Sequence, residues 1–401
     1  MKRFFYLLVR HTLKLTLMVL VACAELPRNP LPEEGYEEAT VLGRADLRYW
    51  GDKVPQLPWI EYARSNPDQV VEKYPAVART EHNYLALSGG GANGAYGAGL
   101  LVGWSEEGSR PEFTLVTGIS IGALTAPFAF LGTDYDGLLK EVYTTLDSSS
   151  IFLTRSVFGI FRSDSLVDST PLTEVLEKYV TDELIAKIAV QYRKGRSLWI
   201  GTTNLDAGRP VIWDIGRIAI SEDPAAPALI RSILQASASI PGAFPPVYIQ
   251  VQGPDGEIYD EMHVDGGTSS QLFLYPQGIK WDVVLTALQV KGRPKAYLIR
   301  NSYLEPAYDP VPRKMLPIIS RTMESLIRTQ GVGDAYRIYA LARRDGIDVK
   351  MSWIPKDSVA VTPRETFDPD YMAALFEYGR RRGLAQDAWI DLAEQIEGKA
   401  H

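Results

Sequence analysis

A glycine-rich segment directly after a short apolar run constrains the fold of this chain more than any other feature. Residues 85–99 read LALSGGGANGAYGAG. Glycine inside a helix or strand costs roughly 0.5–1 kcal/mol relative to alanine, so such a cluster indicates that the backbone must closely approach another group. A phosphate, a transition-state oxyanion or a neighbouring helix could be that group, and the rest of the chain has to decide among them.

Apolar, strand-like runs alternate with longer helical patterns from residue 84 onward. This alternation predicts an α/β fold: a central, mostly parallel sheet with helices on both faces, followed by a C-terminal helical layer. The predicted strands are 84–87, 113–117, 197–203, 211–214, 247–251, 258–264, 282–288, 295–300 and 348–354. Helices are expected at 57–74, 92–107, 122–131, 225–239, 314–344 and 369–382.

The second motif is Gly-Ile-Ser-Ile-Gly at residues 118–122, between a predicted strand and a predicted helix. A nucleophile elbow requires this context. Its serine, Ser120, would lie on a turn so sharp that the residues two positions away approach each other, which requires glycine at Gly118 and Gly122. The helix that follows would direct its positive end at the Ser120 hydroxyl. A helix that begins with small residues against a sheet is the alternative interpretation.

The third motif is Val-Asp-Gly-Gly at residues 264–267, where another predicted strand ends. A carboxylate at a strand end, followed by Gly266 and Gly267, can stand open to a neighbouring loop. Taken alone, the motif is also compatible with an ordinary Asp-Gly turn.

In order, the glycine-rich loop, the serine elbow and the Asp-Gly-Gly turn resemble the patatin-like phospholipase family over roughly residues 84–275. The segment ASASIPGAFPP at 236–246 is also similar to that family. The resemblance implies a serine lipid acyl hydrolase that cleaves acyl esters of phospholipids or related lipids through a Ser–Asp dyad. It implies no cofactor.

In this interpretation Asp265 accepts the proton of Ser120 as the hydroxyl attacks an acyl ester. The oxyanion that forms needs fixed donors, and backbone N–H groups provide them only where no side chain blocks the approach. The residues implied for this oxyanion hole are Gly89, Gly90, Gly91 and Ala92. The later glycines are expected to pack the following helix against its neighbours; they are Gly94, Gly97 and Gly99.

Histidine placement supports a dyad rather than a triad. The order Ser, Asp, His of α/β-hydrolases needs a histidine after the aspartate, and only the last residue of the chain qualifies. His263, two residues before Asp265, is the rival base, although a hydrogen-bonded structural role is expected for it. The four histidines are His11, His82, His263 and His401.

The N-terminus has the pattern of a signal peptide. Basic residues precede an apolar run at 15–22, which is too short to span a bilayer because a helical span needs about 20 residues. The run ends in Leu-Val-Ala-Cys, which resembles the bacterial lipobox, and Cys23 is the sole cysteine. We therefore expect a lipid anchor at Cys23 in the bacterial envelope. Alanine and not aspartate follows the cysteine, which by resemblance to the sorting rules of enteric bacteria implies the outer membrane. A buried free cysteine after an ordinary cleaved signal is the alternative.

These patterns divide the chain into a lipoprotein signal peptide (1–22), a lipid-anchored linker and N-terminal extension (23–80), a patatin-like catalytic domain (81–305) and a C-terminal helical segment packed on it (306–401). The expected partners are a lipid or acyl-ester substrate and a membrane. A net charge of −7 without a long basic run argues against nucleic acid. No His/Cys cluster in the sequence indicates a metal site.

Two other functions stay open. One is a non-catalytic surface lipoprotein that kept the patatin fold. The other is a dinucleotide-binding protein, since Gly89, Gly91 and Gly94 match Gly-x-Gly-x-x-Gly; the acidic residue expected about 20 residues further on is missing. Many family members carry Arg or Lys at the position of Asn93, so an anionic head group is not implied. The apolar stretch 148–166 could be a lid, an acyl-chain entrance or a cover for the core.

Overall fold

The computed structural model describes residues 27–393, apart from 55–57, 157–162, 307, 309, 357 and 386; the side chains of 58–61 and 316 are not described either. The predicted signal peptide and Cys23 lie outside the described residues. So do Phe158 and Phe161 of the apolar stretch.

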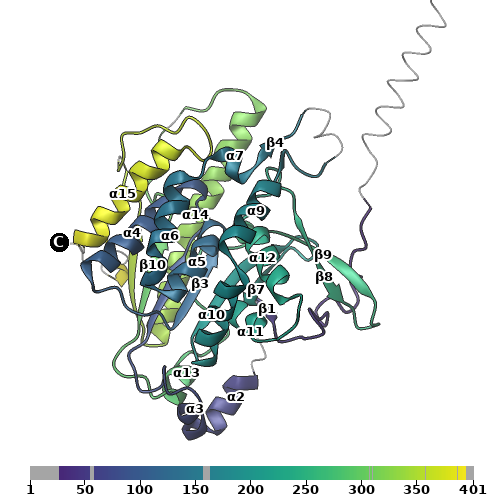
Figure 1. Cartoon of the computed structure of the whole chain (residues 1–401), viewed down its shortest axis with the longest axis vertical. Coiled ribbons are helices and arrows are strands. Elements are labelled where there is room, and N and C mark those ends of the chain that lie inside the picture. The colour runs from purple at the N-terminus through teal and green to yellow at the C-terminus, as the bar shows by residue number, and fades with distance from the viewer. Residues whose placement is uncertain are drawn as a thin grey trace, which may run out of the picture.

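A ten-stranded mixed sheet forms the centre of the molecule (Figure 1). Five strands at its middle are parallel, in the order β6 (Ser197–Asn204), β3 (Leu115–Ile119), β2 (Asn83–Leu87), β10 (Lys295–Arg300) and β11 (Asp348–Trp353). The remaining strands pair antiparallel: β7 (Arg209–Asp214), β1 (Arg48–Trp50), β9 (Ile258–Asp265), β8 (Val247–Gln252) and β12 (Ile390–Asp391). The predicted α/β fold is confirmed, with a sheet that is mixed because antiparallel strands flank the parallel centre.

Helices cover both faces of the sheet. On β2, Leu85 and Leu87 join one hydrophobic cluster while Tyr84 and Ala86 join another, as expected when successive side chains point to opposite faces. The first cluster includes residues of α4 (Gly94–Glu107), α5 (Ile121–Leu131), α6 (Asp136–Thr145), α9 (Thr170–Tyr179), α10 (Asp182–Arg193), α11 (Ile215–Ala219), α12 (Ala226–Ser237) and α15 (Pro369–Ala385). The second includes residues of α13 (Asp282–Ala287) and α14 (Met315–Arg344).

Helices α4 and α15 touch backbone to backbone through glycine. A Cβ added at Gly99 would lie 1.9 Å from the Phe376 carbonyl oxygen, and one at Gly103 would lie 1.9 Å from that of Arg380. From the other helix, a Cβ at Gly379 would lie 2.3 Å from the Tyr96 carbonyl oxygen. Part of the glycine-rich segment therefore serves helix packing, in agreement with the expectation from the sequence.

The predicted strand at 282–288 is wrong, because residues Asp282–Ala287 form α13. Val284 and Ala287 are buried at a spacing of three, which matches one face of a helical turn. A short apolar run fits a strand and a buried helix equally well, and tertiary packing decides between them.

The predicted linker also differs from the structure over its described part. β1 pairs with β7 at the sheet edge, and the Arg28 guanidinium bonds to both Asp206 and Asp260. These contacts hold the N-terminal extension against the domain, close to β9. The patch at 57–74 forms two short helices, α2 (Pro58–Ser65) and α3 (Pro67–Lys73).

Two short strands, β4 (Leu153–Thr154) and β5 (Val167–Asp168), form a separate small sheet after α7 (Ser148–Ile151). β4 lies within the apolar stretch 148–166 and β5 follows it directly. The Phe152 ring of this stretch packs against Phe244 and Phe367. Within the described ranges, no helix combines the length and apolarity needed to cross a membrane.

Candidate active site

Strand β3 leads into α5 through a sharp turn at Ser120. This residue has φ 55° and ψ −127°, a conformation that L residues rarely adopt. A Cβ added at Gly118 would lie 2.6 Å from the Gly122 carbonyl oxygen, and one at Gly122 would lie 2.4 Å from that of Leu87. Both glycines are therefore required by close backbone approach, which is the steric reason that the Gly-x-Ser-x-Gly spacing predicts.

The sheet brings Ser120 and Asp265 together from distant parts of the chain. Along β6, Ile119 of β3 pairs with Gly201 and Asp265 of β9 pairs with Thr202. Because β7 occupies the other edge of β6, β3 and β9 must share one edge and meet end to end. The residue after β3 and the last residue of β9 are thus neighbours.

The two side chains form a direct hydrogen bond. The Ser120 hydroxyl donates to Asp265 Oδ2 at 2.6 Å, and the Gly267 N–H donates to Asp265 Oδ1 at 2.7 Å. Burial raises the pKa of Asp265 to about 7, although the bonds from Ser120 and the Gly267 N–H act in the opposite direction. This carboxyl can therefore take up and release a proton near neutral pH.

The glycine-rich loop lies against Ser120. A Cβ added at Gly89 would be 3.2 Å from Ser120 Cβ, so only glycine fits without displacing the serine. At Gly90 an added Cβ would be 2.1 Å from the Asn301 carbonyl oxygen, whereas Gly91 has φ +56° and an added Cβ there meets no atom within 4 Å. In the described part of the chain, no protein acceptor is hydrogen-bonded to the backbone N–H groups of residues 89–92. The loop therefore offers unpaired donors beside Ser120.

Asn301, just after β10, anchors this loop. Its N–H donates to Ser88 Oγ at 2.8 Å, its side-chain amide donates to the Ser88 carbonyl at 3.1 Å, and its Oδ1 accepts the Gly97 N–H at 3.1 Å. One buried side chain thus ties both ends of the loop to the neighbouring strand. Sequence reasoning missed Asn301, because it is more than 200 residues from the loop and belongs to none of the three motifs.

Ser237 and Gln271 were also missed. The Ser237 hydroxyl accepts the Ser120 N–H at 3.0 Å and donates to the Gly201 carbonyl at 2.7 Å, which fixes the elbow to β6. The Gln271 side-chain amide donates to the Gly267 carbonyl at 2.7 Å and to Gln330 Oε1 at 3.1 Å. A signal existed for Ser237 alone, since it lies in the family-like segment 236–246.

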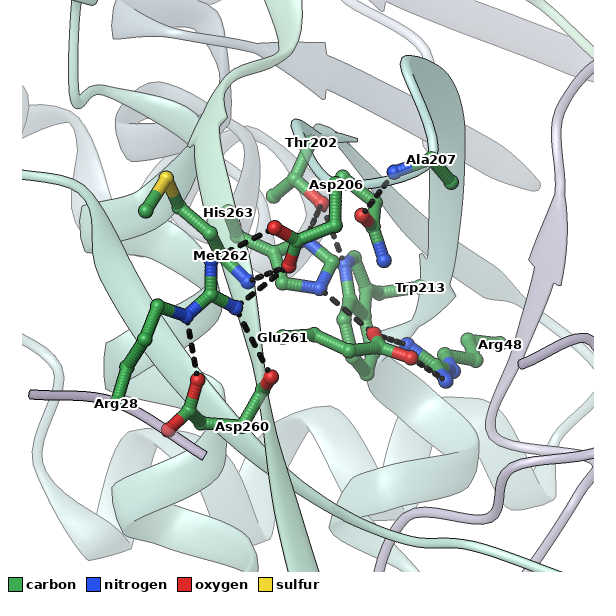
Figure 2. A network of polar contacts seen from close by, with 11 residues as sticks. Arg28, Arg48, Thr202, Asp206, Ala207, Trp213, Asp260, Glu261, Met262 and His263 are labelled. Atoms are coloured by element: carbon green, nitrogen blue, oxygen red, sulfur yellow. Dashed lines mark hydrogen bonds and ion pairs between the residues drawn. The ribbon is translucent and has the colours of Figure 1, made fainter. Parts of the chain in front are cut away.

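Both described histidines have structural partners. His263 is fully buried, with Nδ1 3.0 Å from Thr202 Oγ1 and Nε2 3.1 Å from Glu261 Oε2 (Figure 2). His82, directly before β2, lies 2.8 Å from the Val77 carbonyl and 3.0 Å from the Tyr84 hydroxyl. Burial lowers the pKa of each imidazole. Since both ring nitrogens of His263 are engaged away from Ser120, the expected structural role agrees with the geometry.

The network around His263 continues into the N-terminal extension (Figure 2). Glu261 pairs with both guanidinium nitrogens of Arg48 in β1. Burial alone would raise the pKa of Glu261, but Arg48 and His263 bring it to about 2. Through this ion pair, the N-terminal extension contacts and stabilises β9, the strand that ends at Asp265.

The helices that follow the Ser120 turn enclose an apolar cavity of about 50 Å³. Ile121, the residue after Ser120, is part of its wall, together with side chains from α5, α6, α9 and the start of α15. Phe128, Leu172 and Met372 are among them. The wall of this apolar space therefore begins at the residue that follows Ser120, while Ser120 and Asp265 are not among its lining residues.

Comparison with known proteins bears on the region that contains all three motifs. Residues 85–275 match the family model described as patatin-like phospholipase. Among solved structures, VipD from Legionella pneumophila is similar with a TM-score of 0.36 and 13% sequence identity, over 78% of this chain and 68% of that chain. A comparison with curated proteins finds no match.

The family match spans the loop, the elbow and the Asp-Gly-Gly turn together. It agrees with the α/β architecture and with the order of these motifs along the chain. The match therefore supports assigning residues 85–275 to the patatin-like phospholipases, and with them to lipid acyl hydrolases in general.

Proposed function

We propose that this protein is a serine lipid acyl hydrolase that acts through a Ser120–Asp265 dyad. The observation that carries the proposal is the 2.6 Å hydrogen bond from the Ser120 hydroxyl to a buried carboxylate, at a turn that only a Gly-x-Ser-x-Gly sequence can form. A protein that kept the fold without catalysis would have no need to maintain the strained Ser120 backbone or to bury Asp265.

The reaction follows from the positions of these groups. Asp265 takes the proton from Ser120 as Oγ attacks the carbonyl carbon of an acyl ester. The carbonyl oxygen becomes an oxyanion, which the loop N–H groups stabilise. As the intermediate collapses, the alcohol leaves with the proton held by Asp265 and an acyl-serine remains. Water, deprotonated by Asp265, then releases the carboxylic acid and restores Ser120.

The apolar cavity supports an acyl chain as the part of the substrate nearest the nucleophile. Its walls are aliphatic and aromatic, and they begin at the residue next to Ser120. Asn93, where a cation is common in the family, hydrogen-bonds to the Tyr371 hydroxyl at 2.7 Å. This neutral position leaves the head group unspecified, so we propose phospholipids or related acyl lipids as the class.

The pH dependence tests this proposal. A base must be deprotonated to act, and the pKa of Asp265 is raised to about 7 by burial. We expect kcat/KM on an uncharged soluble ester to rise with pH, to reach half its maximum near pH 7 and to fall about tenfold per unit below that. A profile that stays flat down to pH 5, in protein shown by circular dichroism to be folded, would contradict Asp265 as the base.

A matched pair of glycine variants tests the oxyanion loop. Gly91 and Gly108 both have positive φ, and an added Cβ meets nothing within 4 Å at either site. Gly108 ends α4, away from the motifs. We expect Gly91→Ala to lower kcat by about 10²-fold, because the loop donors shift. Gly108→Ala should lose comparable stability without losing turnover. Equal, small effects on kcat would make the loop a packing device only.

We also propose a lipid anchor at Cys23 in the outer membrane of a bacterial cell envelope. The support is the lipobox-like sequence and the use of the sole cysteine there. More than one acyl chain is needed for stable anchoring, since burial contributes about 0.8 kcal/mol per CH₂. Cys23→Ser should leave the protein unprocessed or move it out of the membrane fraction. Mass spectrometry of mature, membrane-bound protein that finds Cys23 unmodified would contradict the anchor.

A further inference from the structure

No described segment of the chain covers the first half of α14. Helix α14 runs from Met315 to Arg344, and its second half contributes buried Ala335, Ile338 and Ala342 to the core. In residues 315–330, by contrast, no described side chain is buried. These 16 residues, called the projecting half below, would extend over about 24 Å.

Six large apolar side chains of the projecting half are exposed to between 38% and 72%. The other five follow the first, Met315, by three, four, eight, eleven and twelve residues. Because each residue advances the helix by about 100°, all six lie on one side of the helix. This apolar stripe consists of Met315, Ile318, Ile319, Met323, Leu326 and Ile327. An exposed apolar surface of this kind marks an interaction site more often than an ordinary surface.

The apolar stripe does not continue the face that α14 buries in the domain. By the same helical geometry, its centre is rotated by about a third of a turn from the face that carries Ala335, Ile338 and Ala342. It therefore points away from the core on which the second half packs. Among the described residues, nothing occupies this surface.

Charge identifies the occupant of this surface. Residues 313–330 carry four basic side chains and one acidic side chain, a net charge of +3 in a chain whose net charge is −7. Within the helix, Arg321 and Arg328 lie on the side opposite the apolar stripe. An apolar face with arginines on the opposite side is the pattern of helices that lie in the interface of an anionic membrane.

The last residue of the projecting half lies beside the candidate active site. This residue, Gln330, accepts a hydrogen bond from Gln271, whose amide also bonds to the Gly267 carbonyl. One turn further on, Asp334 accepts the Gln271 N–H at 2.6 Å. The helix is thus connected through one side chain to the turn that carries Asp265.

Further exposed apolar side chains lie at the same end of the molecule. Figure 1 shows the upper end of α14 at the end where α7 and β4 lie. Leu153 in β4 is 55% exposed and Leu166, before β5, is 50% exposed. The Leu166 N–H bonds to the Gly242 carbonyl, near Ile240, which is 38% exposed.

We propose that the apolar stripe of α14 docks the protein on the surface of a membrane that contains anionic lipid, with the candidate active site facing that surface. This proposal depends on the proposed function in one respect: the membrane would supply the lipid substrate. A second copy of the chain fits less well, because pairing two projecting halves would bring two net charges of +3 together.

Fluorescence at the helix tests docking without using activity. In full-length chain carrying Cys23→Ser, a single environment-sensitive label is placed through Met323→Cys, in the stripe, or through Glu324→Cys, on the opposite side. Vesicles of phosphatidylcholine with phosphatidylglycerol should shift the emission to the blue at position 323 and leave 324 nearly unchanged. Added salt, or phosphatidylcholine alone, should weaken the shift.

Two outcomes of this test would overturn the proposal. One is no difference between the two positions on any vesicle. The other is a shift at 323 that follows protein concentration without lipid, which would make the stripe a contact between copies.

Kinetics give the second arm. Ile319→Ser combined with Leu326→Ser should lower hydrolysis of vesicle lipid by about tenfold at limiting lipid. The soluble-ester rate should stay within twofold, which also shows that the variant is folded. Ser320→Ala combined with Ser325→Ala, at two exposed positions that lie outside the stripe by the same helical geometry, is the control on the same segment. Unchanged vesicle hydrolysis in the stripe variant contradicts docking, whereas absence of hydrolysis in the unaltered chain contradicts the proposed function and leaves the fluorescence result standing.

Discussion

Ser120→Ala is expected to lower turnover of an acyl ester by about 10⁴–10⁶-fold, as removal of a catalytic nucleophile does elsewhere. The substitution deletes one hydroxyl and leaves the turn to be held by Gly118, Gly122 and the bond from the backbone N–H to Ser237. The folded state should therefore persist, with a circular dichroism spectrum that matches the unaltered protein. The measurement is kcat on a soluble ester and on dispersed phospholipid.

Residual activity decides how this result is interpreted. Turnover near that of the unaltered protein, in variant protein that is cleanly folded, would exclude Ser120 as the nucleophile. The same outcome would leave the 2.6 Å contact with Asp265 as a structural hydrogen bond only.

Asp265→Asn should be nearly as damaging, because no other described side chain is placed to take the proton. The amide keeps the shape of the carboxyl: its single oxygen can accept the Gly267 N–H, while its NH2 group donates to the Ser120 hydroxyl oxygen. At the same time, thermal stability at pH 8 should rise. Because burial raises the pKa of this carboxyl, its ionisation destabilises the folded protein as the pH rises toward about 7. The neutral amide of asparagine has no such cost.

His263→Gln is the matched control for Asp265→Asn. Glutamine can preserve a bond to Thr202 or Glu261, so activity per folded molecule should be largely retained. If His263→Gln is as inactive as Ser120→Ala while its fold is intact, a histidine base replaces the dyad interpretation. Loss of stability without loss of specific activity would agree with the buried network of Figure 2.

The proposed reacting residues could be singled out from the sequence because their constraints are local. Gly118 and Gly122 are needed by a turn of five residues, and a strand before and a helix after are visible as apolar patterns. Asp265 and the two glycines after it likewise form one short motif. What makes these motifs a site is that β3 and β9 meet end to end along β6, and this pairing joins residues 145 positions apart.

The supporting side chains could not be predicted for the same physical reason. Asn301 reaches Ser88 across 213 positions, and Asp334 reaches Gln271 across 63. A buried amide or carboxyl in a helix or after a strand has no sequence pattern of its own, since its partner is set by tertiary packing. The error at 282–288 has a related origin, because packing chose a helix for an apolar run that fits both structures.

Helix α14 illustrates the difference between an element and its environment. The sequence predicts a helix over 314–344, and the structure has Met315–Arg344. The apolar content of its first half gives no indication that the described part of the domain leaves this half uncovered. Only the fold reveals that the core ends near Gly331, where an added Cβ would lie 1.6 Å from the Arg300 guanidinium.

Covalent labelling with a fluorophosphonate, read by peptide mass spectrometry, tests the central claim most directly. A nucleophilic serine activated by Asp265 should carry the label on Ser120. The rate of labelling should increase with pH to a plateau, with a midpoint near the pKa of about 7. Labelling should be absent in Ser120→Ala and strongly slowed in Asp265→Asn. A label on another residue, or labelling of Ser120 at an unchanged rate in Asp265→Asn, would contradict the dyad.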